Sequence, residues 1–434
     1  MKVFSTRQKN NFYTMSEAIN LGIAPDGGLF LPKSFPKFKE DSFKNLYDLS
    51  LDEFAFNVLY PFFSDEIQPN DFATICAKTF DFPLHFKNLS KKLYLLELFH
   101  GPTAAFKDFG AKFLANFLEF SRGSDQILKT IIVATSGDTG GAVASAFFEK
   151  KGFNIVILFP KGLVSERQKL QLTCWGGNIL SLEVEGTFDD CQKMAKTLMT
   201  EHASTFDFGS ANSINIARLL PQSIYHAYTA LHLYRITGEV HNFIVPTGNL
   251  GNALACYWAR EMGFPISGIV FATNNNKTLS EYFESHSYNP RPSVATIANA
   301  MDVGDPSNFE RLVSMNPKAF ENKNLFSVNA ASDQEIYDQI SSVFKEFGEM
   351  ICPHTATAFI ARQKLKLEDQ HVVLVGTAHP CKFDEIVMRA TDIPVPICDA
   401  MREIENLPSY YEPIENDLEK TLSAIKRHQL NQSN

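Results

Sequence analysis

Short apolar runs alternate with helical patterns in the first half of the chain, and this alternation limits the possible folds more than any other feature. The runs are Thr130–Ala134, Asn154–Phe159 and Ile179–Val184. A glycine-rich turn and a helical pattern through Glu149 follow the first run, and a helix is expected from about Ser165. Because neighbouring parallel strands need a crossover helix between them, the pattern predicts a parallel sheet with helices on both faces.

A second series of helices and strands follows. Helices are expected from Ile216 to about Ile236 and over Ala253–Met262. The strand candidates are Asn242–Val245, Ile266–Ala272 and Val372–Val375. The sequence therefore predicts an α/β fold with two opposed α/β subdomains. Each has a glycine-rich loop at the carboxyl end of a strand, where open α/β sheets bind ligands.

The chain has 434 residues, which is enough for two or three domains. We expect an N-terminal domain over residues 1–92, where the sequence is α-rich, irregular and full of phenylalanine. The first α/β subdomain is expected over residues 93–205 and the second over residues 206–400. Residues 401–434 are expected to form a C-terminal helical tail.

Composition excludes several classes of function. The formal net charge of -9 and the absence of a basic run disfavour nucleic-acid binding. The opening residues Met1–Asn10 are polar, and no apolar stretch reaches the length of a membrane span. The seven cysteines are scattered without a CxxC pair, so neither a zinc site nor a disulfide framework is expected. We therefore expect a cytoplasmic protein with no bound metal.

The segment His100–Gly110 places a lysine at the start of a helix. Apolar residues at helical spacing after Lys107 predict that a helix begins near it. The positive end of the helix dipole and the apolar neighbours Ala104–Phe106 both disfavour the ammonium form. A neutral amine so placed can be a Schiff-base nucleophile, although a surface lysine at a helix start is the ordinary alternative.

Two glycine-rich loops each lie between a strand and a helix. The first, Thr135–Gly141, carries three hydroxyls and the carboxylate of Asp138; the second is Pro246–Asn252. Backbone N–H groups at such helix starts bind anions, although the polar side chains of the first loop could simply cap its helix. The second loop matches neither the dinucleotide nor the P-loop signature, which disfavours a nucleotide-binding protein.

Two further segments carry candidate ligands. Ser213 or Asn215 could cap the helix from Ile216, but Arg218 in its first turn is electrostatically unfavoured, so we expect an anionic partner. A guanidinium beside capping donors suits a phosphate monoester. At the end of the last strand, the hydroxyl of Thr377 could meet a ring nitrogen of a ligand, or the segment could be an ordinary turn. His379 stays unassigned.

Taken together and in this order, these segments resemble the threonine synthase family. The matching stretches are LFHGPTAAFKDFG, ATSGDTGG, SANSINIARLLPQ, VPTGNLGN, ANAMDV and GTAHP, and DGGLFLP fits the longer form of the family. The resemblance covers nearly the whole chain. It implies the fold-type II architecture of pyridoxal-5′-phosphate (PLP) enzymes, the tryptophan synthase β-like family.

The resemblance also implies roles for particular residues. Lys107 aligns with the lysine that carries PLP as a Schiff base. The other residues expected to bind the cofactor are the phosphate loop Gly248, Asn249, Leu250, Gly251 and Asn252, and Thr377 at the pyridine nitrogen. Those expected to bind the substrate are Thr135, Ser136, Asp138 and Thr139 for its carboxylate, and Ser213, Asn215, Arg218 and Lys161 for its phosphate. The partner of the cofactor's phenolic oxygen stays open, since an asparagine is usual there and Asp138 is the nearest candidate.

The implied reaction converts O-phospho-L-homoserine and water into L-threonine and phosphate, as the last step of threonine biosynthesis. The alternatives are a serine/threonine dehydratase or a phosphohomoserine lyase of the same fold. Arg218 favours a phosphorylated substrate over free serine. We expect a monomer or a homodimer.

Overall fold

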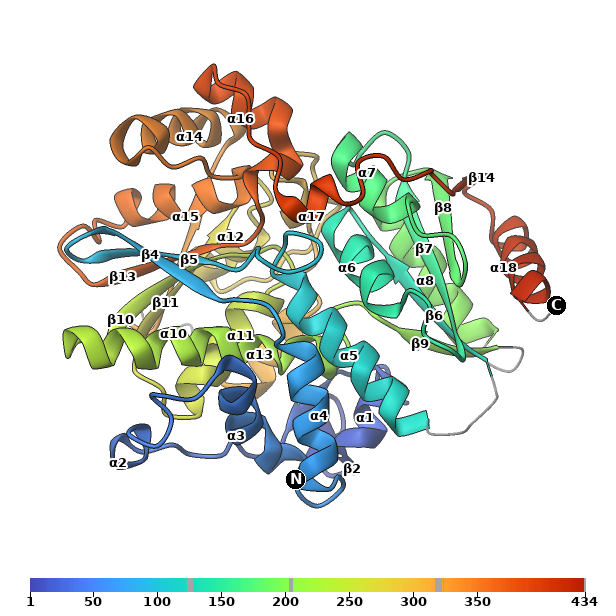
Figure 1. The fold of residues 1–434 in the computed structure, drawn as a ribbon, viewed down its shortest axis with the longest axis horizontal. Helices are drawn as coiled ribbons and strands as arrows, with labels where there is room; N and C mark the ends of the chain where they lie inside the picture. Colours follow the sequence, from blue (N-terminus) through green and yellow to red (C-terminus); the bar gives the residue numbers. More distant parts are fainter. Residues whose placement is uncertain (123–127, 203–205, 317–321, 323, 433–434) are drawn as a thin grey trace.

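The computed structural model describes residues 1–122, 128–202, 206–316, 322 and 324–432. Two sheets with helices on both faces form most of the molecule, and a smaller N-terminal part lies against them (Figure 1). Among the described residues, no helix combines the length and apolar character that crossing a membrane requires.

The larger sheet, over the described residues, has six strands in the order β12-β11-β10-β13-β5-β4. They are β4 (His85–Ser90), β5 (Leu93–Glu97), β10 (His241–Pro246), β11 (Ile266–Thr273), β12 (Phe326–Ala330) and β13 (Val372–Gly376). All neighbours are parallel except β4 and β5. Helical crossovers make such parallel pairing possible.

Helices cover both faces of this sheet. They are α10 (Gln222–Thr237) and α11 (Gly251–Glu261) on one face and α14 (Asp333–Phe347) and α15 (Pro353–Lys364) on the other (Figure 1). Successive β13 side chains confirm the two faces: Val373 and Val375 pack in the core with α10 and α11, and Val372 and Leu374 in the core with α14 and α15. Burial on both faces explains why the inner strands β5, β10, β11 and β13 are mostly continuous apolar runs rather than alternating ones.

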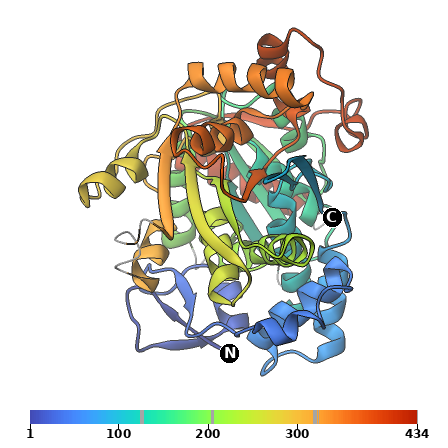
Figure 2. The same ribbon diagram turned by 90° about the vertical axis from the view of Figure 1, so that its left-hand side faces the viewer.

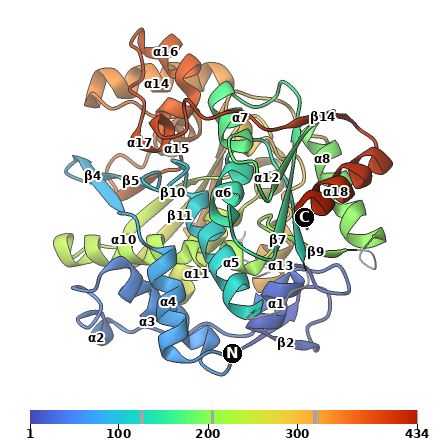
Figure 3. The same ribbon diagram turned by 45° about the vertical axis from the view of Figure 1, so that its right-hand side comes forward.

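The smaller sheet is parallel throughout, with its described strands in the order β14-β8-β7-β6-β9. They are β6 (Lys129–Ala134), β7 (Phe153–Pro160), β8 (Ile179–Glu185), β9 (Asp207–Ser210) and β14 (Glu412–Glu415). One face packs in a core with α5 (Lys107–Arg122) and α6 (Asp138–Phe147), and α7 (Glu166–Thr173) lies beside α6. The other packs on α8 (Phe188–Glu201) and α18 (Leu418–Gln432), which Figure 3 shows at the right-hand edge.

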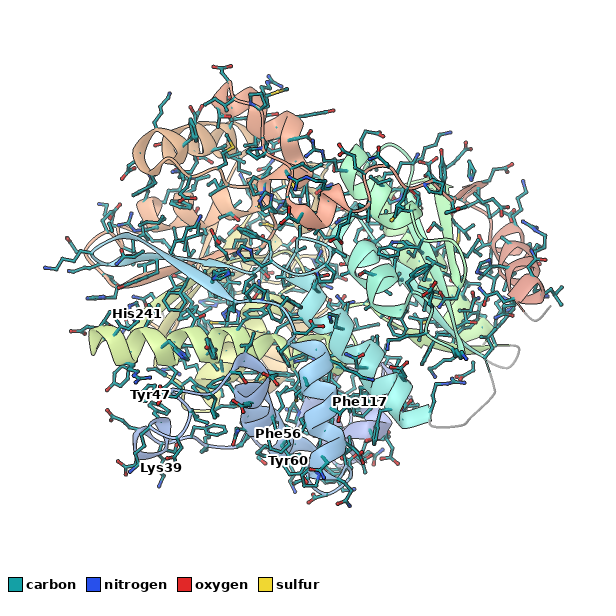
Figure 4. The ribbon with its side chains drawn as sticks, in the orientation of Figure 1. Lys39, Tyr47, Phe56, Tyr60, Phe117 and His241 are labelled. Carbon is teal, nitrogen blue, oxygen red and sulfur yellow. The ribbon has the colours of Figure 1, made fainter. Side chains whose placement is uncertain are left out.

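The N-terminal part combines a small antiparallel sheet with helices, and Figure 2 shows it along the bottom of the molecule. Its elements are β1 (Lys2–Ser5), β2 (Phe12–Thr14), α1 (Met15–Leu21), β3 (Phe30–Pro32), α2 (Glu40–Phe43), α3 (Leu51–Phe63) and α4 (Pro69–Thr79). Aromatic rings join it to the rest: the Phe63 ring centroid lies 5.5 Å from that of Phe117 in α5. Figure 4 labels Phe117 together with Phe56 and Tyr60, which stack on each other at 5.0 Å. The N-terminal part therefore shares one core with α5 and α10.

Three strands of the smaller sheet, β6, β7 and β8, match their predicted positions, whereas β9 and β14 were not predicted and two further expectations differ from the structure. The single helix expected from Ile216 to about Ile236 is wrong, because the chain forms α9 (Ile216–Leu219) and then α10. Pro221 stands between them, and a proline inside a helix removes a hydrogen bond and clashes with the preceding turn. The expectation that residues 1–92 are simply α-rich omits the β2-β1-β3 sheet.

Four strands join a different sheet from the one that the predicted subdomain limits imply. Strands β4 and β5 belong to the larger sheet, although they precede residue 205. Strand β9 pairs with β6 in the smaller sheet, and β14, in the expected helical tail, pairs with β8. Apart from β4, which pairs with the next strand, these strands have partners far away in sequence, and periodicity identifies a strand without identifying its neighbour.

The remaining short elements connect or cover these layers. They are α12 (Thr278–Ser285), η1 (Asn299–Met301), α13 (Phe309–Met315), η3 (Pro380–Phe383), α16 (Asp384–Thr391) and α17 (Asp399–Arg402). Helix α16 packs against α14, and η3 contacts α7 on the other subdomain. The segment after β13 therefore bridges the two α/β halves.

Candidate active site

A cavity lies at the carboxyl ends of β6, β10 and β13, and it collects most of the residues singled out from the sequence. Those lining it are Lys107, Thr135, Ser136, Asp138, Thr139, Ser213, Arg218, Gly248, Asn249, Gly251, Asn252 and Thr377. They come from both α/β halves, as expected for loops at strand ends that face each other.

Three of the predicted site residues do not line this cavity. The ammonium of Lys161 pairs with Glu185 at 3.1 Å, and more than half of each side chain is exposed. The Asn215 side chain caps α9 through the Ala217 N–H at 3.0 Å and donates to the Ile19 carbonyl at 3.0 Å. The Leu250 side chain is fully buried in the core. Asn215 therefore supports the site loop, and Leu250 could contribute only its backbone.

Lys107 is the first residue of α5, as predicted. The backbone before it is held against β13, because the Phe106 N–H donates to the Thr377 carbonyl at 2.9 Å. Loss of water around the amine lowers the pKa of Lys107 to about 8; Asp138 opposes this shift, and Arg218 and Lys382 add to it. The neutral amine, which can attack a carbonyl carbon, is therefore a minor species at neutral pH but far more abundant than for an ordinary lysine.

The Thr135 hydroxyl shapes the first glycine-rich loop. It accepts hydrogen bonds from the N–H groups of Gly137 and Gly140, both at 2.9 Å. Gly137 has φ +132°, and a Cβ there would lie 2.5 Å from the Gln168 side chain, so only glycine fits. Thr135 thus organises the loop, while Ser136 and Thr139 are only partly buried and face the cavity.

Asp138 forms a buried ion pair that the sequence analysis missed. Its Oδ1 lies 2.8 Å from Nζ of Lys382, which is fully buried and also donates to the Thr103 carbonyl at 2.8 Å. Gln168 donates to the same oxygen at 2.9 Å. Burial would raise the pKa of Asp138, but Lys382 and then Lys107 outweigh it and hold the pKa well below its usual range. The carboxylate is therefore ionised beside the cavity.

The second glycine-rich loop fits a phosphate group. A Cβ at Gly248 would lie 2.7 Å from Cα of Met301, so the loop approaches its neighbour too closely for any other residue. Helix α11 begins at Gly251, and its first N–H groups have no partner within the helix. The amide Nδ2 of Asn252 is buried at the cavity without a protein partner among the described residues. With Lys107 and Thr377 on the same cavity, these groups suit pyridoxal phosphate.

Arg218 adds a buried guanidinium to the cavity. Its side chain is buried, Nη1 donates to the Ala211 carbonyl, and Nε is buried without an acceptor among the described residues. Burial lowers the pKa of Arg218 to about 10, opposed by Asp108, so the guanidinium is charged at neutral pH. A buried cation with a free donor suits an anionic substrate group.

Arg311 in α13 is a further functional candidate that the sequence analysis missed. Its fully buried guanidinium donates to the carbonyls of Phe30 at 3.0 Å and Ser213 at 3.1 Å, and to Oδ1 of Asn308 at 2.6 Å. Asn308 in turn donates to the Asn249 carbonyl at 3.0 Å. Arg311 therefore ties the N-terminal part to the two cavity segments that carry Ser213 and Asn249. No sequence signal marks it, since its partners are backbone groups from distant segments.

His354, at the start of α15, also lines the cavity and was not predicted. Its Nε2 accepts a hydrogen bond from the Ala300 N–H at 3.1 Å, while Nδ1 is buried without a partner among the described residues. Burial lowers the pKa of His354 to about 4, so the ring is neutral at the cavity. The His-Thr pair after Pro353 gives no signal by itself.

Comparison with known families covers almost the whole chain. A family model for pyridoxal-phosphate dependent enzymes matches residues 79–378, which is more than half of the chain. Models for the threonine synthase N terminus and for the threonine synthase C-terminal region match residues 2–80 and 355–425.

Individual relatives agree with these matches. The chain is 33% identical to a threonine synthase of Escherichia coli over 99% of this chain and 100% of that protein, and 34% identical to one of Haemophilus influenzae over 96% and 97%. Two solved threonine synthases cover 99% of both chains: the PLP-bound one of Brucella melitensis (TM-score 0.91, 32% identity) and the yeast one (TM-score 0.90, 28% identity). The expected fold-type II architecture and PLP cofactor are confirmed. The chain belongs to the threonine synthase family of PLP-dependent lyases.

Proposed function

We propose that the substrate of this cavity is O-phospho-L-homoserine, which the protein converts with water into L-threonine and phosphate. The observation that carries the proposal is Arg218, a buried and charged guanidinium whose Nε has no acceptor, on the same cavity as Lys107. The cofactor phosphate already has the N-terminus of α11. A second buried cation therefore indicates a second anionic group, and the phosphate of the substrate supplies one.

The two ends of the substrate meet different parts of the cavity. The loop with Ser136 and Thr139 receives the amino-acid carboxylate through hydroxyls and the N–H groups at the start of α6. Ser213 and Arg218 receive the substrate phosphate and stabilise the negative charge that grows on it as it leaves from Cγ. Thr377, on the β13 side, meets the cofactor ring. Lys161 is not included, because it lies on the surface with Glu185.

Lys107 moves the protons at the substrate carbon atoms. Bound pyridoxal phosphate supplies an electron sink for the pair released when the Cα–H bond breaks. The neutral amine of Lys107 takes that proton, and its lowered pKa makes the basic form more abundant near neutral pH than it is for an ordinary lysine. Asp138 stays ionised because it forms an ion pair with Lys382. Its negative charge therefore stabilises positive charge near the reacting groups, and it does not donate a proton.

The cellular compartment and the oligomeric state of the protein are also proposals, and the compartment that we propose is the cytoplasm. The cysteines are all unpaired, which suits the reducing cytoplasm. We propose a monomer or a homodimer, and size-exclusion chromatography with light scattering would decide between them. A larger assembly would contradict this proposal.

The absorbance spectrum of the purified protein is the first test. We expect a band near about 410–430 nm, typical of a PLP Schiff base, that disappears in Lys107→Ala. Threonine and phosphate should then appear in equal amounts from O-phosphohomoserine. A 2-oxo acid in place of threonine would support the lyase or dehydratase alternative and refute the proposed product. A colourless protein that added PLP cannot restore would refute the role of Lys107.

A further inference from the structure

Two cysteine sulfur atoms are in contact beside the active site. Sγ of Cys381, in η3, lies 3.4 Å from Sγ of Cys398, which directly precedes α17. Cys398 is only partly buried, whereas the other six cysteines are buried. A soluble oxidant can therefore reach one member of the pair, and the second member is already at hand.

The local hydrogen bonds favour reaction at Cys398. The contact between the two sulfur atoms lowers the pKa of Cys398 and raises that of Cys381, the more deeply buried of the two. The Met401 N–H and the positive charge of Lys382 act on Cys398 in the same direction. Since the thiolate is the nucleophile in thiol oxidation, Cys398 is the attacking sulfur and Cys381 the resolving one.

The neighbouring His379 does not turn the pair into a metal site. The possible ligand atoms of His379, Cys381 and Cys398 all lie within 4.8 Å of one another. However, Nδ1 of His379 accepts a hydrogen bond from the Cys381 N–H at 3.2 Å. A neutral imidazole with Nδ1 as acceptor carries its proton on Nε2, so neither nitrogen offers a lone pair to an ion. The ring instead orients the backbone at Cys381.

We propose that Cys381 and Cys398 form a reversible disulfide, with hydrogen peroxide as the oxidant. The Cys398 thiolate attacks one peroxide oxygen, the O–O bond breaks, and the released hydroxide takes up a proton to leave as water. The Cys381 thiol then attacks the resulting sulfenic sulfur, the S–S bond forms, and a second water leaves. The two thiols lose two electrons and the peroxide gains them. The sulfur separation falls from 3.4 Å to about 2.05 Å.

This contraction acts on the active site through Lys382, the residue after Cys381. The Lys382 ammonium holds Asp138 at 2.8 Å, and the Ser165 hydroxyl donates to the Lys382 carbonyl at 2.9 Å. A disulfide pulls this backbone toward Cys398 and so shifts the Asp138–Lys382 pair, which lowers turnover. This consequence rests on the proposed function, whereas formation of the disulfide does not.

The test treats the PLP-loaded protein with hydrogen peroxide and then with dithiothreitol. Peptide mapping by mass spectrometry without reduction reports the cross-link, and threonine formation reports turnover. The variants are wild type, Cys398→Ser and, as a matched control, Cys76→Ser, whose cysteine is buried in α4 far along the chain. If Cys398→Ser fails to load PLP, Cys398→Ala replaces it.

We expect the Cys381–Cys398 peptide in wild type and in Cys76→Ser, with turnover lowered about tenfold and restored by dithiothreitol. Cys398→Ser should keep its turnover under peroxide. Absence of the cross-linked peptide, or stoichiometric zinc in the purified protein, would overturn the disulfide. A cross-link without any change in turnover would overturn its effect on the site. A protein that is inactive before peroxide is added would count against the proposed function alone, because peptide mapping would still report whether the Cys381–Cys398 disulfide forms.

Discussion

Replacing Arg311 with methionine tests whether the N-terminal part holds the anion-binding segments in place. The guanidinium is fully buried and has no carboxylate partner in the described structure; its acceptors are backbone carbonyls of Phe30, Ser213 and Ile214 and the Asn308 amide. Burial lowers the pKa of Arg311 to about 9. Its role is therefore to supply donors to carbonyl groups that are buried or partly buried.

The expected loss of stability follows from those acceptors. Three buried or partly buried carbonyls left without a donor cost about 1–3 kcal/mol each. A buried methionine recovers about 1.5–3 kcal/mol through its apolar surface. Taking the middle of each range, the net loss is about 4 kcal/mol, which in a chain of this size lowers Tm by roughly 4 °C.

The expected functional loss is larger than a general loss of stability would produce. Arg311 fixes the Ser213 carbonyl directly and the Asn249 carbonyl through Asn308. Loosening both segments should raise the Kd for PLP about tenfold, which corresponds to about 1.4 kcal/mol. KM should rise more than kcat falls, because the substrate phosphate loses its oriented partners.

The assay combines PLP titration of the apo protein, thermal unfolding and steady-state kinetics. Arg311→Lys keeps the positive charge but loses the planar guanidinium with its several donors. It should therefore recover only part of the lost stability and of the lost PLP affinity. The matched control is Arg7→Met: Arg7 pairs with Glu310 on the surface at 3.1 Å and is more than half exposed, so little should change. If Arg311→Met loses stability while its PLP Kd and KM stay within about twofold of wild type, the positioning role is refuted.

Three other predictions address single side chains of the cavity. Arg218→Ala should raise KM or lower kcat at least about tenfold, since a lost charged hydrogen bond costs about 1.5–3 kcal/mol; unchanged steady-state kinetics would remove Arg218 from the site. Lys382→Met leaves the Asp138 carboxylate buried without its partner and should cost about 3–5 kcal/mol in chemical denaturation; adding Asp138→Asn should recover most of it, and a double variant as unstable as the single one would contradict this. The rate at which apo protein captures PLP, followed by stopped-flow absorbance, should rise with pH through about 8 and level off above it, because the pKa of Lys107 lies near 8 and only the neutral amine attacks; a flat profile would show that Lys107 is not the attacking group.

The sequence predicted the local elements well and their partners poorly. The runs that became β6, β7 and β8 were located to within a residue at each end, because β-branched residues between a glycine-rich turn and a helical pattern leave few alternatives. Nothing local indicates that Leu93 pairs with Val372 rather than with a strand of the first subdomain. That pairing depends on which buried surfaces are left when the helices have packed.

Some residues of the candidate site could likewise be predicted from the sequence, and others could not. The loop around Asp138 and the loop from Gly248 stand at strand ends and Lys107 stands at a helix start, so their place at the cavity could be predicted from the sequence. Lys382 and Arg311 could not, because each is defined by what it meets in space: a carboxylate from another loop, or carbonyls of distant backbone. The roles of all these residues in catalysis stay predictions until the variants are measured.

The pairing of β5 with β13 has a consequence for how the molecule is made. The strand that leads to Lys107 is synthesised early, but its neighbour and Thr377 leave the ribosome only near the end. A nascent chain therefore contains Lys107 long before it contains all of the residues that line the cavity around the Lys107 amine. Loading of the cofactor must wait for nearly the whole polypeptide, so a chain released too early holds no PLP and keeps an open sheet edge exposed to proteases.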